Sequence, residues 1–129
     1  MEKVPPLPPL PPQNYSQIHE EMPLRVDIYP AKGNVKKYTA VFYYEDGKKK
    51  TIHFGDRRYQ DYTQHNDMER RKAYLARHEA REDWDEPDNA GSLSAWLLWG
   101  EHTDFKENLA EYKKYFGINA VLHAGKNLR

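Results

Sequence analysis

A basic stripe in the middle of the chain has the residue types and spacing best suited to chemistry. Arg70, Tyr74, Arg77 and Arg81 recur at intervals of four, three and four residues, which places them on one face of an α-helix. Guanidinium groups on one face suit phosphates, and the tyrosine could stack on a base. The stripe makes nucleic-acid binding a candidate function. Pairing with the protein's own acidic residues is the plainer alternative, because several acids lie close by.

The sequence carries no pattern that indicates an enzyme. It has no cysteine, no Gly-x-Ser-x-Gly motif and no glycine-rich phosphate loop. Asp27, Glu45 and residues 48–50 supply the acids and lysines that nucleases use. Their spacing does not differ from that of an ordinary hairpin, so we expect no enzymatic activity.

Three histidines, His53, His65 and His78, could be combined with Asp61 or Asp67 into a metal site. They lie twelve and thirteen residues apart along the chain, and this spacing matches no compact ligand pattern. We therefore expect hydrogen-bonded structural histidines, with no metal and no cofactor.

The first 23 residues are rich in proline and are expected to form an extended arm. They hold seven of the nine prolines, and proline favours polyproline II over helix or sheet. Leucines three residues apart lie along one edge of such a helix, which suits docking on a neighbouring protein. The residues expected to make that contact are Pro5, Pro6, Leu7, Pro8, Pro9 and Leu10.

Residues 24–117 are expected to form one compact α+β domain, in which a small antiparallel sheet packs on about three helices. Alternation predicts a strand over 24–29, and residues 36–54 read as a hairpin around Asp46-Gly47. A two-residue turn there would pair Tyr43 with Lys50. In that register one face of the hairpin is expected to pack against the core. It comprises Thr39, Val41, Tyr43, Ile52 and Phe54.

Cap residues and apolar spacing predict the three helices. The first covers about 67–81 behind an Asn66-x-x-Glu69 capping box, and the second follows Ser92 as far as Gly100. The third begins at Asp104 and ends at Gly117, while residues 118–129 read as a tail without a period.

Three tryptophans supply apolar surface that a small domain cannot easily bury. Trp96 and Trp99 belong to a helix that is apolar on almost all sides, and Trp84 lies in an acidic loop. All three are expected to be mostly core, with part of their surface available to a protein partner.

Charge is balanced overall and unevenly distributed along the chain. The formal net charge is zero, yet residues 35–58 carry +4, residues 82–111 carry −8 and residues 112–129 carry +4. Such segments can pair within the protein or meet neighbours of opposite sign. No apolar run approaches the roughly 20 residues that a membrane-spanning helix needs.

Several segments in order resemble a family of small proteins of nucleocytoplasmic large double-stranded DNA viruses of algae and amoebae. The resemblance covers roughly residues 36–116. The segments that carry it are Thr51-Ile-His-Phe-Gly55, Tyr59 to His65, Arg70 to His78, Glu82-Asp-Trp84 and Ala90 to Trp99.

This resemblance implies a viral origin and brings no catalytic residues with it. With the arm and the charge layout, it predicts a structural virion component, most simply a minor capsid (cement) protein inside an icosahedral shell. Its partners would be the major capsid protein and neighbouring minor capsid proteins, and it would pass through the host cytoplasm during assembly. The alternative is a viral nucleic-acid-binding accessory protein that uses Arg70, Arg77 and Arg81.

Overall fold

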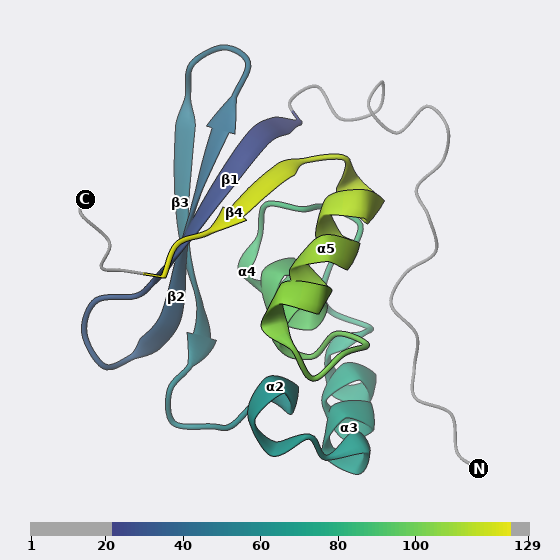
Figure 1. Cartoon of the computed structure of the whole chain (residues 1–129). Helices are drawn as coiled ribbons and strands as arrows, with labels where there is room; N and C mark the ends of the chain where they lie inside the picture. Colours follow the sequence, from purple (N-terminus) through teal and green to yellow (C-terminus); the bar gives the residue numbers. More distant parts are fainter. Residues whose placement is uncertain (1–21, 125–129) are drawn as a thin grey trace.

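The computed structural model describes residues 22–124, which form a four-stranded sheet with the helices on one face (Figure 1). The predicted α+β class is confirmed. In chain order the elements are β1 (Pro23–Pro30), β2 (Lys36–Tyr44), β3 (Lys49–Asp56), α2 (Tyr62–His65), α3 (Met68–His78), α4 (Ala90–Leu93), the π-helix η1 (Ser94–Leu98), α5 (Phe105–Phe116) and β4 (Asn119–Leu122). The proline-rich arm lies outside the described residues.

The sheet has the order β3-β2-β1-β4 and is mixed. The hairpin and the first strand are antiparallel, as predicted, whereas β4 runs parallel to β1 with Arg25 opposite Asn119. The prediction of a tail from residue 118 is therefore wrong for the residues of β4. The strand was missed because four residues are too short to display a period.

The hairpin has a register one residue away from the predicted one. The Tyr44 amide donates to the Lys48 carbonyl oxygen at 3.0 Å, which encloses a three-residue loop, and Gly47 has a φ of 90°. Tyr43 therefore lies opposite Lys49 rather than Lys50. Positive φ at the last loop residue is typical of three-residue hairpin loops, and the longer loop explains the shift.

The strands present a different face to the helices from the one predicted. Ala40 and Phe42 are fully buried there, together with Val26 and Ile28 of β1 and Phe54 of β3. The prediction placed Thr39, Val41 and Tyr43 on this side. Those three belong to the opposite face, because side chains alternate along a strand.

The capping residues set the helix boundaries, and these boundaries differ from some of the predicted ranges. Asp67 caps α3 by accepting from the Glu69 and Arg70 amides, while Asn66, with a φ of 56°, ends α2. The predicted cap was one residue early, and the helix ends at His78 rather than Arg81. Asp104 and Gly117 bound α5 as predicted.

The apolar helix after residue 89 is capped by Asn89 rather than by Ser92 and continues into a π-helix. Its wider turn is closed by the Trp99 amide, which donates to the Ser94 carbonyl oxygen at 3.0 Å. The Asn108 side chain of α5 then donates to the carbonyl oxygens of Leu97 and His102, at 3.0 and 2.9 Å. These bonds fix the end of η1 against α5.

Candidate functional site

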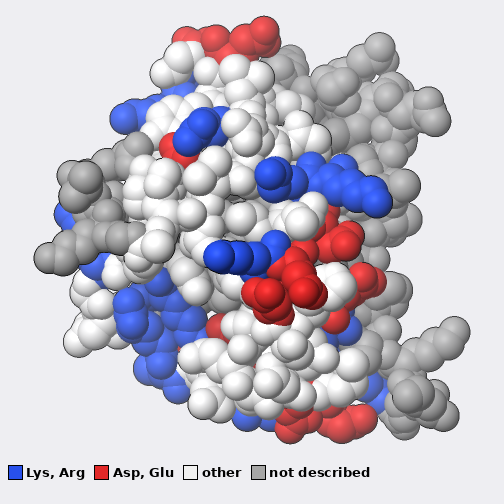
Figure 2. Space-filling model, in the orientation of Figure 1, with Lys and Arg blue, Asp and Glu red and all other residues white. Residues whose placement is uncertain are grey.

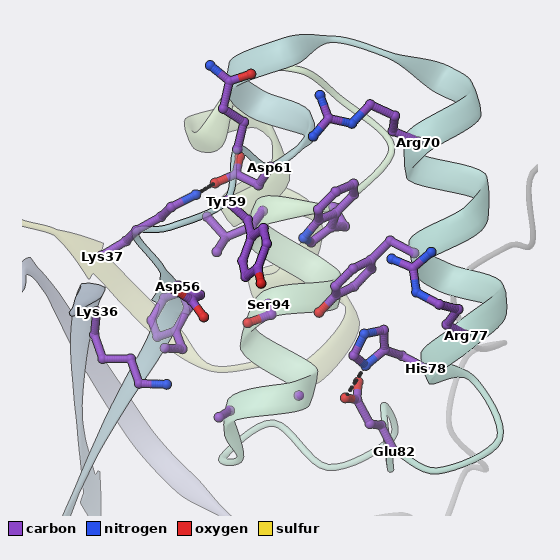
Figure 3. Close-up of a pocket in the computed structure, with 18 of the residues that line it drawn as sticks. Lys36, Lys37, Asp56, Tyr59, Asp61, Arg70, Arg77, His78, Glu82 and Ser94 are labelled. Atoms are coloured by element: carbon purple, nitrogen blue, oxygen red, sulfur yellow. Dashed lines mark hydrogen bonds and ion pairs between the residues drawn. The ribbon is translucent and has the colours of Figure 1, made fainter.

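A pocket of about 680 Å³ opens between the end of β3, the loop after it, α3 and the start of η1 (Figure 3). This volume falls within the roughly 300–1,000 Å³ of sites for small ligands. Part of the pocket wall consists of glycine and alanine residues, whose small side chains leave room for a ligand. The lining comprises Lys36, Lys37, Phe54, Gly55, Asp56, Tyr59, Gln60, Asp61, Arg70, Ala73, Tyr74, Arg77, His78, Glu82, Ala90, Gly91, Ser94, Leu98 and Trp99.

Three of the four residues of the predicted basic stripe line this pocket. Arg70, Tyr74 and Arg77 project from one face of α3, as their spacing predicted. Arg81 does not line the pocket, because the helix ends at His78 and Arg81 lies in the following turn.

The two pocket arginines are exposed and available to a ligand. Neither the Arg70 nor the Arg77 side chain makes a hydrogen bond or ion pair with residues 22–124. Figure 3 shows both side chains reaching from α3 toward the pocket. Two guanidinium groups with free donors therefore face one half-open pocket.

The acidic groups of the lining are occupied by partners. Lys37 Nζ lies 2.7 Å from Asp61 Oδ2, and His78 Nδ1 lies 2.7 Å from Glu82 Oε2. The Asp56 carboxylate accepts hydrogen bonds from Arg58, which lower the pKa of Asp56 to about 2. Each acid thus has a cationic or donor group beside it, and this pairing weakens its repulsion of an anion.

The Tyr74 ring lies between two other rings. Trp99 stacks on it at 4.1 Å with 3° between the planes, and His78 stacks at 4.2 Å with 25°. Both faces are covered, so the expectation that Tyr74 stacks on a base is wrong. Burial raises the pKa of Tyr74 well above its ordinary value, and the hydroxyl is therefore neutral.

Tyr59, which the sequence analysis did not select, supplies an accessible aromatic ring. It follows β3, lines the pocket and is 63% exposed. In Figure 3 its ring points into the pocket above Ser94. The guanidinium of Arg58 lies 5.5 Å from the ring centroid. An exposed tyrosine beside two arginines was the signal available in the sequence.

All three tryptophans belong to the buried core, as predicted. Trp84 and Trp96 are each 5% exposed. Trp96 Nε1 donates to the Trp84 carbonyl oxygen at 3.2 Å, and Trp84 Nε1 donates to Glu82 at 3.0 Å. Their predicted contact with a protein partner is wrong for this structure, because their surface is already buried. Trp99 is 9% exposed and also forms part of the pocket wall.

The other groups considered from the sequence lie elsewhere or have structural partners. Asp27 is buried on the sheet and binds Arg25 and His123. His53 Nδ1 lies 2.9 Å from the Thr39 hydroxyl. Residues 22–124 hold no group of three or more acids or histidines arranged for a metal ion. In the same residues no helix is long and apolar enough to cross a membrane.

The oppositely charged segments meet each other within the domain. Asp88 of the acidic segment lies 3.5 Å from Lys50 Nζ and accepts a hydrogen bond from Tyr44 at 2.5 Å. Basic and acidic side chains also lie side by side on the face in Figure 2. Part of the charge segregation is therefore internal pairing, which requires no partner.

Comparison with known protein families gives a match over part of the chain. Residues 26–78, less than half of the chain, are similar to a family of unknown function (DUF5754). The matched segment runs from β1 to the end of α3 and includes Tyr59, Arg70 and Arg77. No curated protein and no solved structure matches the chain.

Proposed function

We propose that this protein binds nucleic acid through the pocket, with Arg70 and Arg77 as the phosphate contacts. The observation that carries the proposal is the pair of guanidinium groups that line one pocket without a partner among the described residues. Arginine binds phosphate with charge-assisted, often bidentate hydrogen bonds.

The remaining lining supports the same ligand class. Lys36 adds a cation on the wall opposite α3, and Tyr59 offers a ring on which a base can stack. Stacking on an aromatic ring contributes about 1–3 kcal/mol per base. The pocket acids have partners, so the free positive charge is local although the chain has no net charge.

A labelled single-stranded oligonucleotide and fluorescence anisotropy test the proposal. We expect weak binding at physiological salt that strengthens as salt is lowered. Two or three phosphate contacts predict a slope of about −1.4 to −2.1 for log K against log salt concentration.

Arg81 provides the matched control for this experiment. Arg77→Glu should abolish binding, whereas Arg81→Glu makes the same charge change outside the pocket and should retain most of it. Equal losses in the two variants would mean that general charge attracts the strand. The absence of binding at low salt would reject the proposal.

The structural virion role remains a prediction. It depends on the viral resemblance and on an arm that lies outside the described residues. Mass spectrometry of purified particles would test it, because a capsid protein must be present in the particles. Absence from particles, with abundance in infected cells, would contradict it.

A further inference from the structure

The pocket differs in shape from a groove that follows a strand. Proteins that bind single strands without sequence preference use grooves of about 4–16 nucleotides for each binding fold. Here the space is about 680 Å³ and has walls from the β3 end, the loop after β3, α3 and the start of η1. One accessible ring lines it, that of Tyr59. A pocket of this volume with one accessible ring suits a ligand the size of a single nucleotide better than a strand.

Arg70 and Arg77 line the pocket without a partner among the described residues, and together they carry one more positive charge than an internal phosphate neutralises. An internal phosphodiester carries a single negative charge, whereas a terminal phosphate monoester carries about −1.5 to −2 at pH 7. Arg70 and Arg77 lie two turns apart on α3, and Figure 3 shows Lys36 on the facing wall. A dianionic group gains more from several cations than a monoanion does.

Acidic side chains flank the free cations on two sides. Asp61 lies beside Lys37, and Glu82 lies beside His78. Pairing weakens the repulsion by these carboxylates without removing it, so a strand that passed through the pocket in both directions would bring further phosphates close to them. A strand that ends there avoids one of the two encounters.

We infer that the pocket takes a terminal nucleotide, with its base against Tyr59 and its phosphate monoester on Arg70 and Arg77. This inference rests on the proposed function and specifies its ligand. The same chemistry is present in a free nucleoside monophosphate and at the phosphorylated end of a strand. The test below therefore includes both sources.

The probes are hexathymidylates labelled at one end and carrying either a phosphate or a hydroxyl at the other. One pair carries this difference at the 5′ end and a second pair carries it at the 3′ end. For one polarity we expect the phosphorylated strand to bind about tenfold or more tightly than its hydroxyl twin. Free thymidine monophosphate should displace it completely if the site accepts either source. Displacement only by phosphorylated strands would assign the site to strand ends.

Substitutions should remove the preference without unfolding the protein. Arg70→Ala and Arg77→Ala should each reduce the gap between the twins, and Arg81→Ala should leave it unchanged. Ala73→Leu narrows the pocket between the two arginines without changing charge. Ala76→Leu makes the same substitution on the same helix at an exposed position outside the lining. Circular dichroism melting verifies that each variant is folded.

The outcomes separate the inference from the proposed function. If the twins bind equally and affinity grows with length, the protein binds strand interiors and this inference is wrong. If Ala73→Leu binds like Ala76→Leu, the ligand lies outside the pocket and the inference is also wrong. If no probe binds at low salt, the proposed function fails with it.

Discussion

Replacing Asn108 by alanine tests whether one buried side chain holds the pocket wall in place. Asn108 is 1% exposed, and its amide group donates to the carbonyl oxygens of Leu97 and His102. Its side-chain oxygen accepts from the His102 amide at 2.9 Å. These bonds fix the end of η1, and the helix with Trp99 supplies pocket residues. The substitution therefore perturbs the core and the site together.

The expected loss of stability is large because three backbone groups lose a partner. An unpaired buried polar group costs about 1–3 kcal/mol. The Leu97 oxygen is buried and should cost about 2 kcal/mol, while the two part-buried His102 groups should cost about 1 kcal/mol each. The total of about 4 kcal/mol corresponds to a fall in Tm of roughly 15 °C or more for a domain of this size.

Thermal and urea unfolding followed by circular dichroism measure the effect. Lys113→Ala, at an exposed position on the same helix, is the control and should change stability by less than about 0.5 kcal/mol. Asn108→Asp keeps the volume but turns an anionic oxygen toward two carbonyl oxygens. It should be at least as unstable as the alanine variant at pH 7 and should recover partly in acid, where a protonated carboxyl can donate. The hydrogen-bond argument is refuted if Asn108→Asp equals the wild type at pH 7.

Two further predictions concern the sheet. Burial raises the pKa of the Asp27 carboxyl, but hydrogen bonds from Arg25 and His123 outweigh it and lower that pKa below its ordinary value. The stability that Asp27 contributes is therefore present above about pH 4 and is lost as pH falls further. Urea titrations should show a shallower acid loss in Asp27→Asn, and an equal loss would contradict this assignment. At Gly55 (φ 82°) an added Cβ would lie 3.0 Å from Leu98 and Lys37, whereas at Gly33 (φ 81°) nothing lies within 4 Å. Both alanine variants strain the backbone, but Gly55→Ala should lower Tm further, and equal Tm values would exclude the steric contribution.

Local signals in the sequence predicted the elements whose ends are set by contacts between neighbouring residues. Asp104 and Gly117 cap α5 by contacts within a few residues, so their types and positions were sufficient. The hairpin was found for the same reason. Its register was not, because Asp46-Gly47 is compatible with a two-residue and with a three-residue loop. A single additional residue in the loop changes which face of β2 lies beside the Ile52 and Phe54 side of β3.

Elements held by distant contacts could not be predicted in this way. β4 has four residues and lies on β1, with His123 bound to Asp27 across 96 positions of sequence. The end of α3 has no glycine to mark it, and His78 instead binds Glu82 beyond the helix. Neither pairing leaves a periodic pattern. Such contacts become visible only when the segments are brought together in the fold.

The same distinction between local patterns and distant contacts explains which residues of the candidate site were predicted. The α3 wall was predicted because its residues repeat along one helix, whereas Lys36 and Tyr59 come from a strand and a loop with no shared period. The fold also makes Tyr59, rather than the expected Tyr74, the accessible ring of the pocket. Trp99 and His78 cover both faces of Tyr74, while Tyr59 stays accessible.

Local pairing decides how much of the chain's charge is available to a ligand. The formal net charge is zero, and that value alone argues against binding an anion. Within the pocket, however, Asp61 and Glu82 are held by Lys37 and His78, while Arg70 and Arg77 have no such partner among the described residues. The attraction of a ligand in the pocket depends on the charges nearest to it, because salt screens charges that lie more than about 8–10 Å away. A chain with no net charge can therefore still bind a phosphate group of a nucleic acid at this pocket, because its two arginines there are unpaired among the described residues.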